Sequence, residues 1–169
     1  MEMIRYVTYG ITKENFSKEK FYKEKFCKET YKTLPSKPLY GLWGSRVDAE
    51  YGWKDWCADS GFRECSDVNK MEFVLAKDSK ILEVHREVDI LPYIVSHLPQ
   101  FDYSPFQRLE NRSTSIMDAI SFDKLEDEGY DGLELFISDD YLRLHNGVFN
   151  TWDCDSIVVW NFDAIKIID

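Results

Sequence analysis

Short apolar runs near both ends of the chain have the pattern of β-strands. Residues 4–9 alternate β-branched and aromatic side chains and stop at Gly10, while residues 156–160 form an apolar run typical of a strand buried on both faces. The remaining strands are predicted at residues 39–45, 71–76, 80–84, 133–137 and 165–168. A turn at residues 77–79 would join the strands 71–76 and 80–84.

Helical patterns separate these strands. Residues 13–34 cycle through Lys, Glu and aromatic side chains, with Thr12 as the expected N-cap and with Glu/Lys spacing suited to ion pairs along a helix. We expect a solvated amphipathic helix or flap there. The alternative is a surface that binds a partner protein. Further helices are expected at residues 50–57, 88–98, 114–128 and 139–144, and a loop at residues 101–112.

This order of elements predicts the fold class. Strands at both ends with helices between them indicate an α+β fold, in which helices flank a mixed, mainly antiparallel sheet. The chain has 169 residues, of which 44% are hydrophobic, and this is enough for one sizeable core. We therefore expect a single globular domain over residues 1–169.

Composition narrows the classes of function. A formal net charge of -10 opposes tight non-specific binding to nucleic acid or anionic lipid, and no apolar stretch approaches the length of a membrane span. The common phosphate-loop, dinucleotide, serine-hydrolase and zinc-peptidase motifs are absent from the sequence. Four cysteines lack zinc-ribbon spacing, so we expect reduced thiols in a cytoplasmic protein; they are Cys27, Cys57, Cys65 and Cys154.

Two carboxylates, Asp153 and Asp155, stand directly before the apolar run of residues 156–160. Side chains two apart in a strand point to the same side, so the two acids are expected to converge on one cleft. Three alternatives are open: the acids cap the turn, they bind a metal together with residues 139–140, or they stabilise positive charge in a transition state. Asp139 and Asp140 are better suited to the start of a helix, as N-cap and first-turn residues, so no bound metal is expected.

Aromatic and glycine residues supply the other candidate features. Glycines within the strand 39–45 suggest that something approaches its backbone closely. Aromatic residues three apart in the segment 50–57 fit either core packing or the wall of a ligand site. A carboxylate at the lip of an aromatic-lined cleft would stabilise an oxocarbenium-like transition state, as in cleavage of a glycosidic bond.

Three stretches in this order resemble the ADP-ribosyltransferase fold, in particular its small phage and bacterial members. They are Arg5-Tyr6-Val7-Thr8-Tyr9-Gly10, Leu42-Trp43-Gly44-Ser45 and Trp152-Asp153-Cys154-Asp155-Ser156. In that fold an N-terminal strand carries an Arg or His, a middle strand carries a Ser motif, and a late strand starts with the catalytic acid. The present chain departs from the usual pattern, because that acid is commonly Glu and the middle motif is commonly Ser-Thr-Ser.

The resemblance implies NAD as the substrate and assigns roles to particular residues. Asp155 would stabilise the cationic ribose, Asp153 would orient the acceptor, and Ser45 would buttress the site. The residues implied in NAD binding are Arg5, Tyr6, Trp43, Gly44 and Tyr51, with Trp43 or Tyr51 stacking on a ring.

The implied function is ADP-ribosylation of an intracellular protein, as by an effector of a phage or mobile element. Two other functions stay open on the same scaffold. One is a non-enzymatic inhibitor or interaction protein that acts on a partner protein through its acidic surface. The other is a hydrolase of NAD or another nucleotide.

Overall fold

The computed structural model describes residues 3–26, 37–38, 40–97, 117–137, 147–149 and 151–168. The strands are β1 (Tyr6–Tyr9), β2 (Leu42–Arg46), β3 (Lys70–Leu75), β4 (Ile81–Val84), β5 (Ile94–His97), β6 (Met117–Ile120), β7 (Gly132–Leu135), β8 (Ser156–Val159) and β9 (Ile165–Ile167). The α-helices are α1 (Lys18–Phe26), α2 (Trp53–Ser60), α3 (Glu87–Ile90) and α5 (Phe122–Asp127). Short 3-10 turns cover Leu91–Tyr93, Gly147–Phe149 and Phe162–Ala164.

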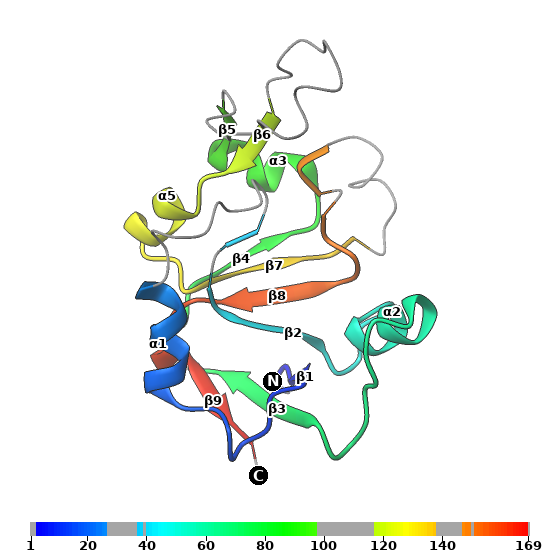
Figure 1. Ribbon diagram of the computed structural model, residues 1–169. Coiled ribbons are helices and arrows are strands. Elements are labelled where there is room, and N and C mark those ends of the chain that lie inside the picture. The colour runs from blue at the N-terminus through cyan, green and yellow to red at the C-terminus, as the bar shows by residue number, and fades with distance from the viewer. Residues whose placement is uncertain are drawn as a thin grey trace, which may run out of the picture.

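A seven-stranded sheet with the order β4-β7-β8-β2-β1-β3-β9 forms the centre of the molecule, and β5 pairs with β6 in a separate two-stranded ladder (Figure 1). Among the described strands only β4 and β7 pair in parallel, and every other ladder is antiparallel. The expected α+β architecture with a mixed, mainly antiparallel sheet is therefore confirmed.

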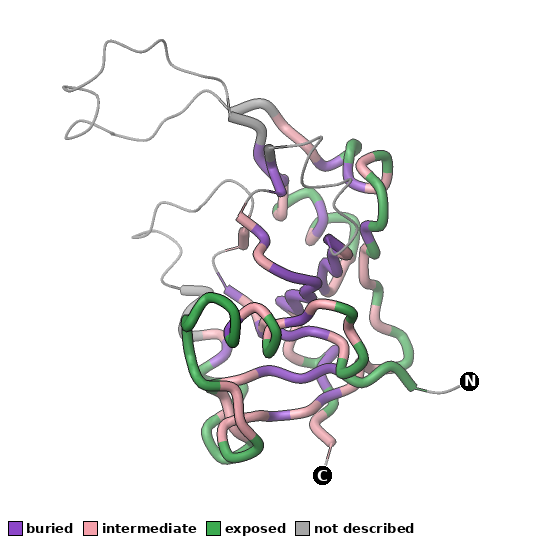
Figure 2. Tube along the Cα trace, turned by 90° about the vertical axis from the view of Figure 1, so that its right-hand side faces the viewer, coloured by how far each residue is buried: buried purple, intermediate pink, exposed green. Residues whose placement is uncertain are grey.

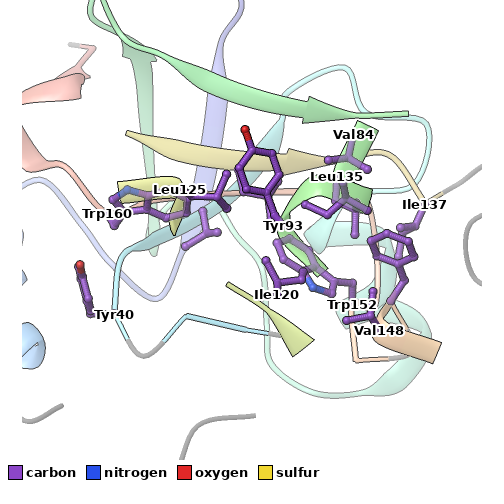
Figure 3. Packing of buried hydrophobic residues seen from close by; sticks show 14 residues of the cluster. Tyr40, Val84, Tyr93, Ile120, Leu125, Leu135, Ile137, Val148, Trp152 and Trp160 are labelled. Atoms are coloured by element: carbon purple, nitrogen blue, oxygen red, sulfur yellow. The ribbon is translucent and has the colours of Figure 1, made fainter. Parts of the chain in front are cut away.

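Strand alternation divides the core into two clusters on opposite faces of the sheet. In β8, Ile157 and Val159 belong to one cluster, while Val158 belongs to the other, which is drawn in Figure 3. Phe21 of α1 packs in the first cluster, and Leu125 of α5 packs in the second. Figure 2 shows buried residues along the central strands and exposed residues mainly in the peripheral turns. The apolar run at 156–160 is thus covered on both sides, as its sequence predicts.

Close packing within the protein explains why position 44 is a glycine, without any ligand. A Cβ atom built on Gly44 would lie 2.8 Å from the carbonyl oxygen of Val7 and 3.2 Å from a ring carbon of Phe73. The close approach predicted for this strand is confirmed, and the groups that approach belong to the chain itself.

Two of the expected helices are partly strands. The helix expected at 88–98 ends with the 3-10 turn at Tyr93, after which Ile94–His97 form β5. The helix expected at 114–128 is wrong at its start, because Met117–Ile120 form β6, and α5 begins after Ser121, whose side chain accepts from the Lys124 amide. Pairing of β5 with β6 supplies backbone partners that local helix propensity could not anticipate.

Other boundaries also differ from expectation. The turn predicted between the strands 71–76 and 80–84 is confirmed, with the Ser79 N–H donating to the Ala76 carbonyl oxygen at 3.0 Å. The two strands do not pair with each other, because β3 pairs with β1 and β9, whereas β4 pairs with β7. Thr12 is not the cap of α1, which begins only after Ser17, whose hydroxyl accepts from the Lys20 amide at 3.3 Å. Residues 27–34 of the expected helix or flap, the loop 101–112 and the helix 139–144 lie outside the described residues. No helix in the described part is long and apolar enough to cross a membrane.

The packing at Gly44 gives a test of the fold. Substitution Gly44→Ala should destabilise the protein by about 1–3 kcal/mol, because β1 and Phe73 must move to admit the methyl group. Urea unfolding followed by circular dichroism measures the change. Val68→Ala, at a side chain that is 88% exposed, is the control and should stay within about 0.5 kcal/mol. Equal stability of Gly44→Ala and the wild type would contradict the packing described for this strand.

Candidate active site at one end of the sheet

Three neighbouring strands bring the sequence stretches of interest to the same end of the sheet. β2 runs antiparallel to both β1 and β8, so the start of β1, the end of β2 and the start of β8 coincide. The register pairs Val7 with Ser45 and Gly44 with Ile157. We call this end the α2 end, because the chain leaves β2 there and enters α2 (Figure 1).

The buried hydroxyl of Ser45 joins three segments at the α2 end. Its Oγ donates to the carbonyl oxygen of Asp155 at 2.6 Å and accepts from the backbone N–H of Trp53 at 2.9 Å. The Asp155 N–H in turn donates to the carbonyl oxygen of Tyr51 at 3.0 Å. The end of β2, the segment before β8 and the start of α2 are therefore held together around a side chain that is 2% exposed.

Asp155 lies inside this junction and is only 7% exposed. Its Oδ1 accepts a hydrogen bond from the backbone N–H of Ile137 at 2.6 Å. Ile137 follows β7, so the carboxylate ties the chain that leaves β7 to the chain that enters β8. This contact gives Asp155 a structural role beside any chemical one.

Asp153 has a different environment. Its Oδ2 lies 3.3 Å from the Nζ of Lys37, and its side chain is 32% exposed. β8 begins only at Ser156, so both aspartates precede the strand, and the alternation that predicted their convergence does not govern them. The two carboxylates engage different partners, Lys37 and the Ile137 amide.

An aromatic pair lies beside Asp153. The rings of Trp43 and Trp152 are tilted with centroids 4.9 Å apart, and Trp152 is fully buried. Lys37 Nζ lies 5.6 Å from the Trp43 ring as well as beside Asp153. The structure thus brings together Trp43 and Asp153, two residues expected at the site, through a shared lysine that sequence reasoning had not singled out.

Arg5 is the most exposed of the expected basic and polar site residues. Its guanidinium bonds to the Glu72 carboxylate of the neighbouring β3, and its side chain is 55% exposed. A surface pocket of about 280 Å³ opens next to it, lined by Met3, Ile4, Arg5, Arg46, Val47 and Asp48. Among the described residues, no hydrogen bond or ion pair joins Arg5 to Ser45 or Asp155.

The two tyrosines expected at the site differ in access. Tyr6 is 2% exposed, its ring stacks on Phe73 at 5.4 Å, and burial raises the pKa of its phenol. Tyr51 is half-buried, and its hydroxyl donates to Asp59 at 2.8 Å. Of the two, only Tyr51 presents surface that a ligand could meet.

A buried ion pair that sequence reasoning missed also lies at the α2 end. Glu134 of β7 is 3% exposed and accepts hydrogen bonds from Nε and Nη2 of Arg46, each at 2.7 Å. The Tyr6 hydroxyl donates to the same carboxylate at 3.2 Å. Burial raises the pKa of Glu134, while the Arg46 guanidinium opposes this shift by stabilising the carboxylate.

One signal in the sequence points to this pair. Glu134 is a single charge inside the otherwise apolar run from Leu133 to Ile137, and a charge on a buried strand requires a partner. Nothing in the sequence identifies Arg46 as that partner, because the two residues are 88 positions apart.

The described thiols are free, as expected, at Cys57, Cys65 and Cys154. Burial raises the pKa of Cys154 to about 11, so this thiol is protonated at neutral pH and a poor nucleophile. Within the described ranges, no group of three or more His, Cys, Asp or Glu side chains is arranged to hold a metal ion. Asp139 and Asp140, the other candidate metal ligands, lie outside those ranges.

Comparison with known proteins adds no relative. No protein-family model matches the chain, and neither a curated protein nor a solved structure is significantly similar to it. A functional assignment therefore depends on the site itself.

The buried ion pair gives a pH-dependent test. Arg46→Met should destabilise the protein by about 3–5 kcal/mol at pH 8, because Glu134 is left buried without its cation. The pKa of Glu134 is already raised, and loss of Arg46 raises it further. The folded state then binds a proton where the unfolded chain does not, so stability is lost as pH rises through the raised pKa. Urea unfolding at pH 5 and pH 8 should show the smaller loss at pH 5.

Arg5→Met is the matched control for this experiment. It removes an arginine from an ion pair whose arginine side chain is 55% exposed, so it should cost no more than about 1 kcal/mol. An Arg46→Met loss that is no larger than this, or that is equal at both pH values, would contradict the buried pair.

Proposed function

We propose that this chain is an NAD-dependent ADP-ribosyltransferase that modifies a protein. One observation carries the proposal: the three stretches that resemble this fold lie on, or directly before, the adjacent strands β1, β2 and β8, and they meet at the same end of the sheet. The stretches are up to 150 positions apart, between Arg5 and Asp155, so their meeting is not a result of local sequence. The bonds from Ser45 to the Asp155 carbonyl and to α2 give further support.

Transfer of ADP-ribose from NAD requires negative charge beside the bond that breaks. As the bond between the ribose C1′ and nicotinamide breaks, its electron pair stays with nicotinamide, which leaves as a neutral molecule. Positive charge then develops on the ribose, and a fixed carboxylate nearby stabilises it. The acceptor atom of the target bonds to C1′, and its proton passes to a carboxylate or to solvent.

The two aspartates differ in exposure, and we assign them different roles for that reason. Asp155 is buried and accepts from the Ile137 amide, so we assign it to holding the start of β8 in place. Asp153 is 32% exposed and lies in the group with Lys37 and Trp43, so we assign it to contact with the ribose. In this assignment Lys37, which pairs with Asp153 in the protein without NAD, turns to the phosphates and leaves the Trp43 ring for stacking. This assignment reverses the one that the sequence favoured, in which Asp155 stabilised the ribose.

A non-enzymatic interaction protein is the second candidate. The observation that favours it is that the polar atoms of Ser45 and one oxygen of Asp155 are engaged in bonds within the protein. A protein with a formal charge of -10 also suits binding to a basic partner. The two functions differ in one measurable property, the release of nicotinamide.

Paired substitutions test the transferase proposal. Asp153→Asn should lower the rate of nicotinamide release from NAD by about 100-fold or more, because the amide carries no charge to stabilise the ribose cation. It should lower the free energy of unfolding by no more than about 1 kcal/mol, since the ion pair that it breaks with Lys37 is partly exposed. Release is measured by chromatography of the reaction mixture, both alone and with a cell extract that supplies acceptors.

Asp155→Asn is the companion variant. Its amide oxygen still accepts from the Ile137 N–H, so the protein should fold, and activity should fall less than in Asp153→Asn. Binding of NAD to the wild type by isothermal titration, with ADP-ribose as competitor, completes the test. No nicotinamide release and no NAD binding at millimolar concentration would reject the transferase and leave the interaction protein.

A further inference from the structure

Helix α2 and the turn after it carry three aromatic side chains in mutual contact, which we call the aromatic cluster: Trp53, Trp56 and Phe62. The two indoles meet edge to face at 5.4 Å, and Phe62 lies 5.1 Å from Trp56 and 6.4 Å from Trp53. Gly61 ends the helix with a φ of 67°, a left-handed conformation that turns the chain so that Phe62 comes back to the indoles.

The aromatic cluster lies outside the core. Among the described residues, neither of the two core clusters includes Trp53, Trp56 or Phe62. Phe62 is 55% exposed, and α2 projects from the end of the sheet in Figure 1. Large aromatic side chains that remain accessible on a helix are typical of interaction surfaces.

One atom of the cluster lacks a partner. The indole Nε1 of Trp53 is the single buried side-chain nitrogen or oxygen in the described residues for which no hydrogen bond is found. A buried N–H without an acceptor is unfavourable, and such groups are rare in folded proteins. Because this atom is buried, a docked segment supplies an acceptor to it only if the aromatic cluster repacks on binding.

Charge around the cluster favours a basic partner. Residues 47–64 contain five acidic and two basic side chains, a net charge of -3, within a chain of net charge -10. One of the basic residues, Arg63, places its guanidinium 5.0 Å from the Phe62 ring. The protein itself thus shows that a ring of the cluster accepts a guanidinium over its face.

We propose that the aromatic cluster is a docking surface for an arginine-bearing segment of a partner protein. The inference rests on the proposed function in one respect, that the partner is the protein to be modified. The backbone N–H of Trp53 bonds to Ser45, so a segment docked on α2 lies directly beside the candidate active site. The rings bind the guanidinium faces, and the carboxylates around α2 balance their charge.

The test uses the full chain labelled with ¹⁵N and needs no NAD. A capped Gly-Arg-Gly-Arg-Gly peptide is added while the indole N–H signals are followed by NMR, with Trp53→Phe and Trp56→Phe used for assignment. Because each cation–π contact is weak, we expect so short a peptide to bind with a Kd of about a millimolar or higher. We expect the Trp53 and Trp56 indole signals to shift with this peptide and not with Gly-Glu-Gly-Glu-Gly.

Two variants make the result specific. Phe62→Ala should weaken arginine-peptide binding by about threefold or more, the effect of losing one ring contact. Val68→Ala, at another exposed apolar residue, should bind as the wild type does. No indole shift at several millimolar peptide, an equal response to the glutamate peptide, or unchanged binding by Phe62→Ala would overturn the proposal. Because nicotinamide release is measured separately, failure of the docking surface is distinguishable from failure of the transferase.

Discussion

The arrangement of the site depends on the hydroxyl of Ser45. It donates to the carbonyl that precedes β8 and accepts from the first amide of α2, so one buried side chain sets the relative positions of three segments. The sheet alone would align β1, β2 and β8 but would leave the chain beyond them free to vary. Through this junction the sheet fixes the position of the segment with Asp153 that precedes β8. It also fixes the orientation of α2 and of the aromatic side chains on it.

The pair formed by Glu134 and Arg46 adds a second constraint at the same end. Desolvation of two charges is unfavourable, and it is offset here by two short hydrogen bonds between them and by the Tyr6 hydroxyl. Elsewhere the central strands are mainly apolar. Charged groups that interrupt such an apolar pattern are often found at functional sites, and a binding site for a charged ligand is one example.

Much of the sheet could be predicted from the sequence, because its strands have clear patterns. The run at 156–160 reads as a doubly buried strand and is one, and residues 4–9 contain β1. Helix propensity failed at residues 117–120, where pairing with β5 decides the structure. The contacts of Asp153 and Asp155 were also beyond prediction, because Lys37 and the Ile137 amide reach them only through the tertiary fold. Strand order, which no local pattern encodes, brought the three stretches together.

The central claim is that NAD binds at the α2 end of the sheet, beside Ser45 and Asp153. A crystal structure of the protein grown with a non-hydrolysable NAD analogue tests it most directly. The account predicts the nicotinamide ribose in contact with the Asp153 carboxylate, and the phosphates near Lys37. An analogue bound elsewhere, or a fully ordered α2 end with no ligand at saturating concentration, would contradict it.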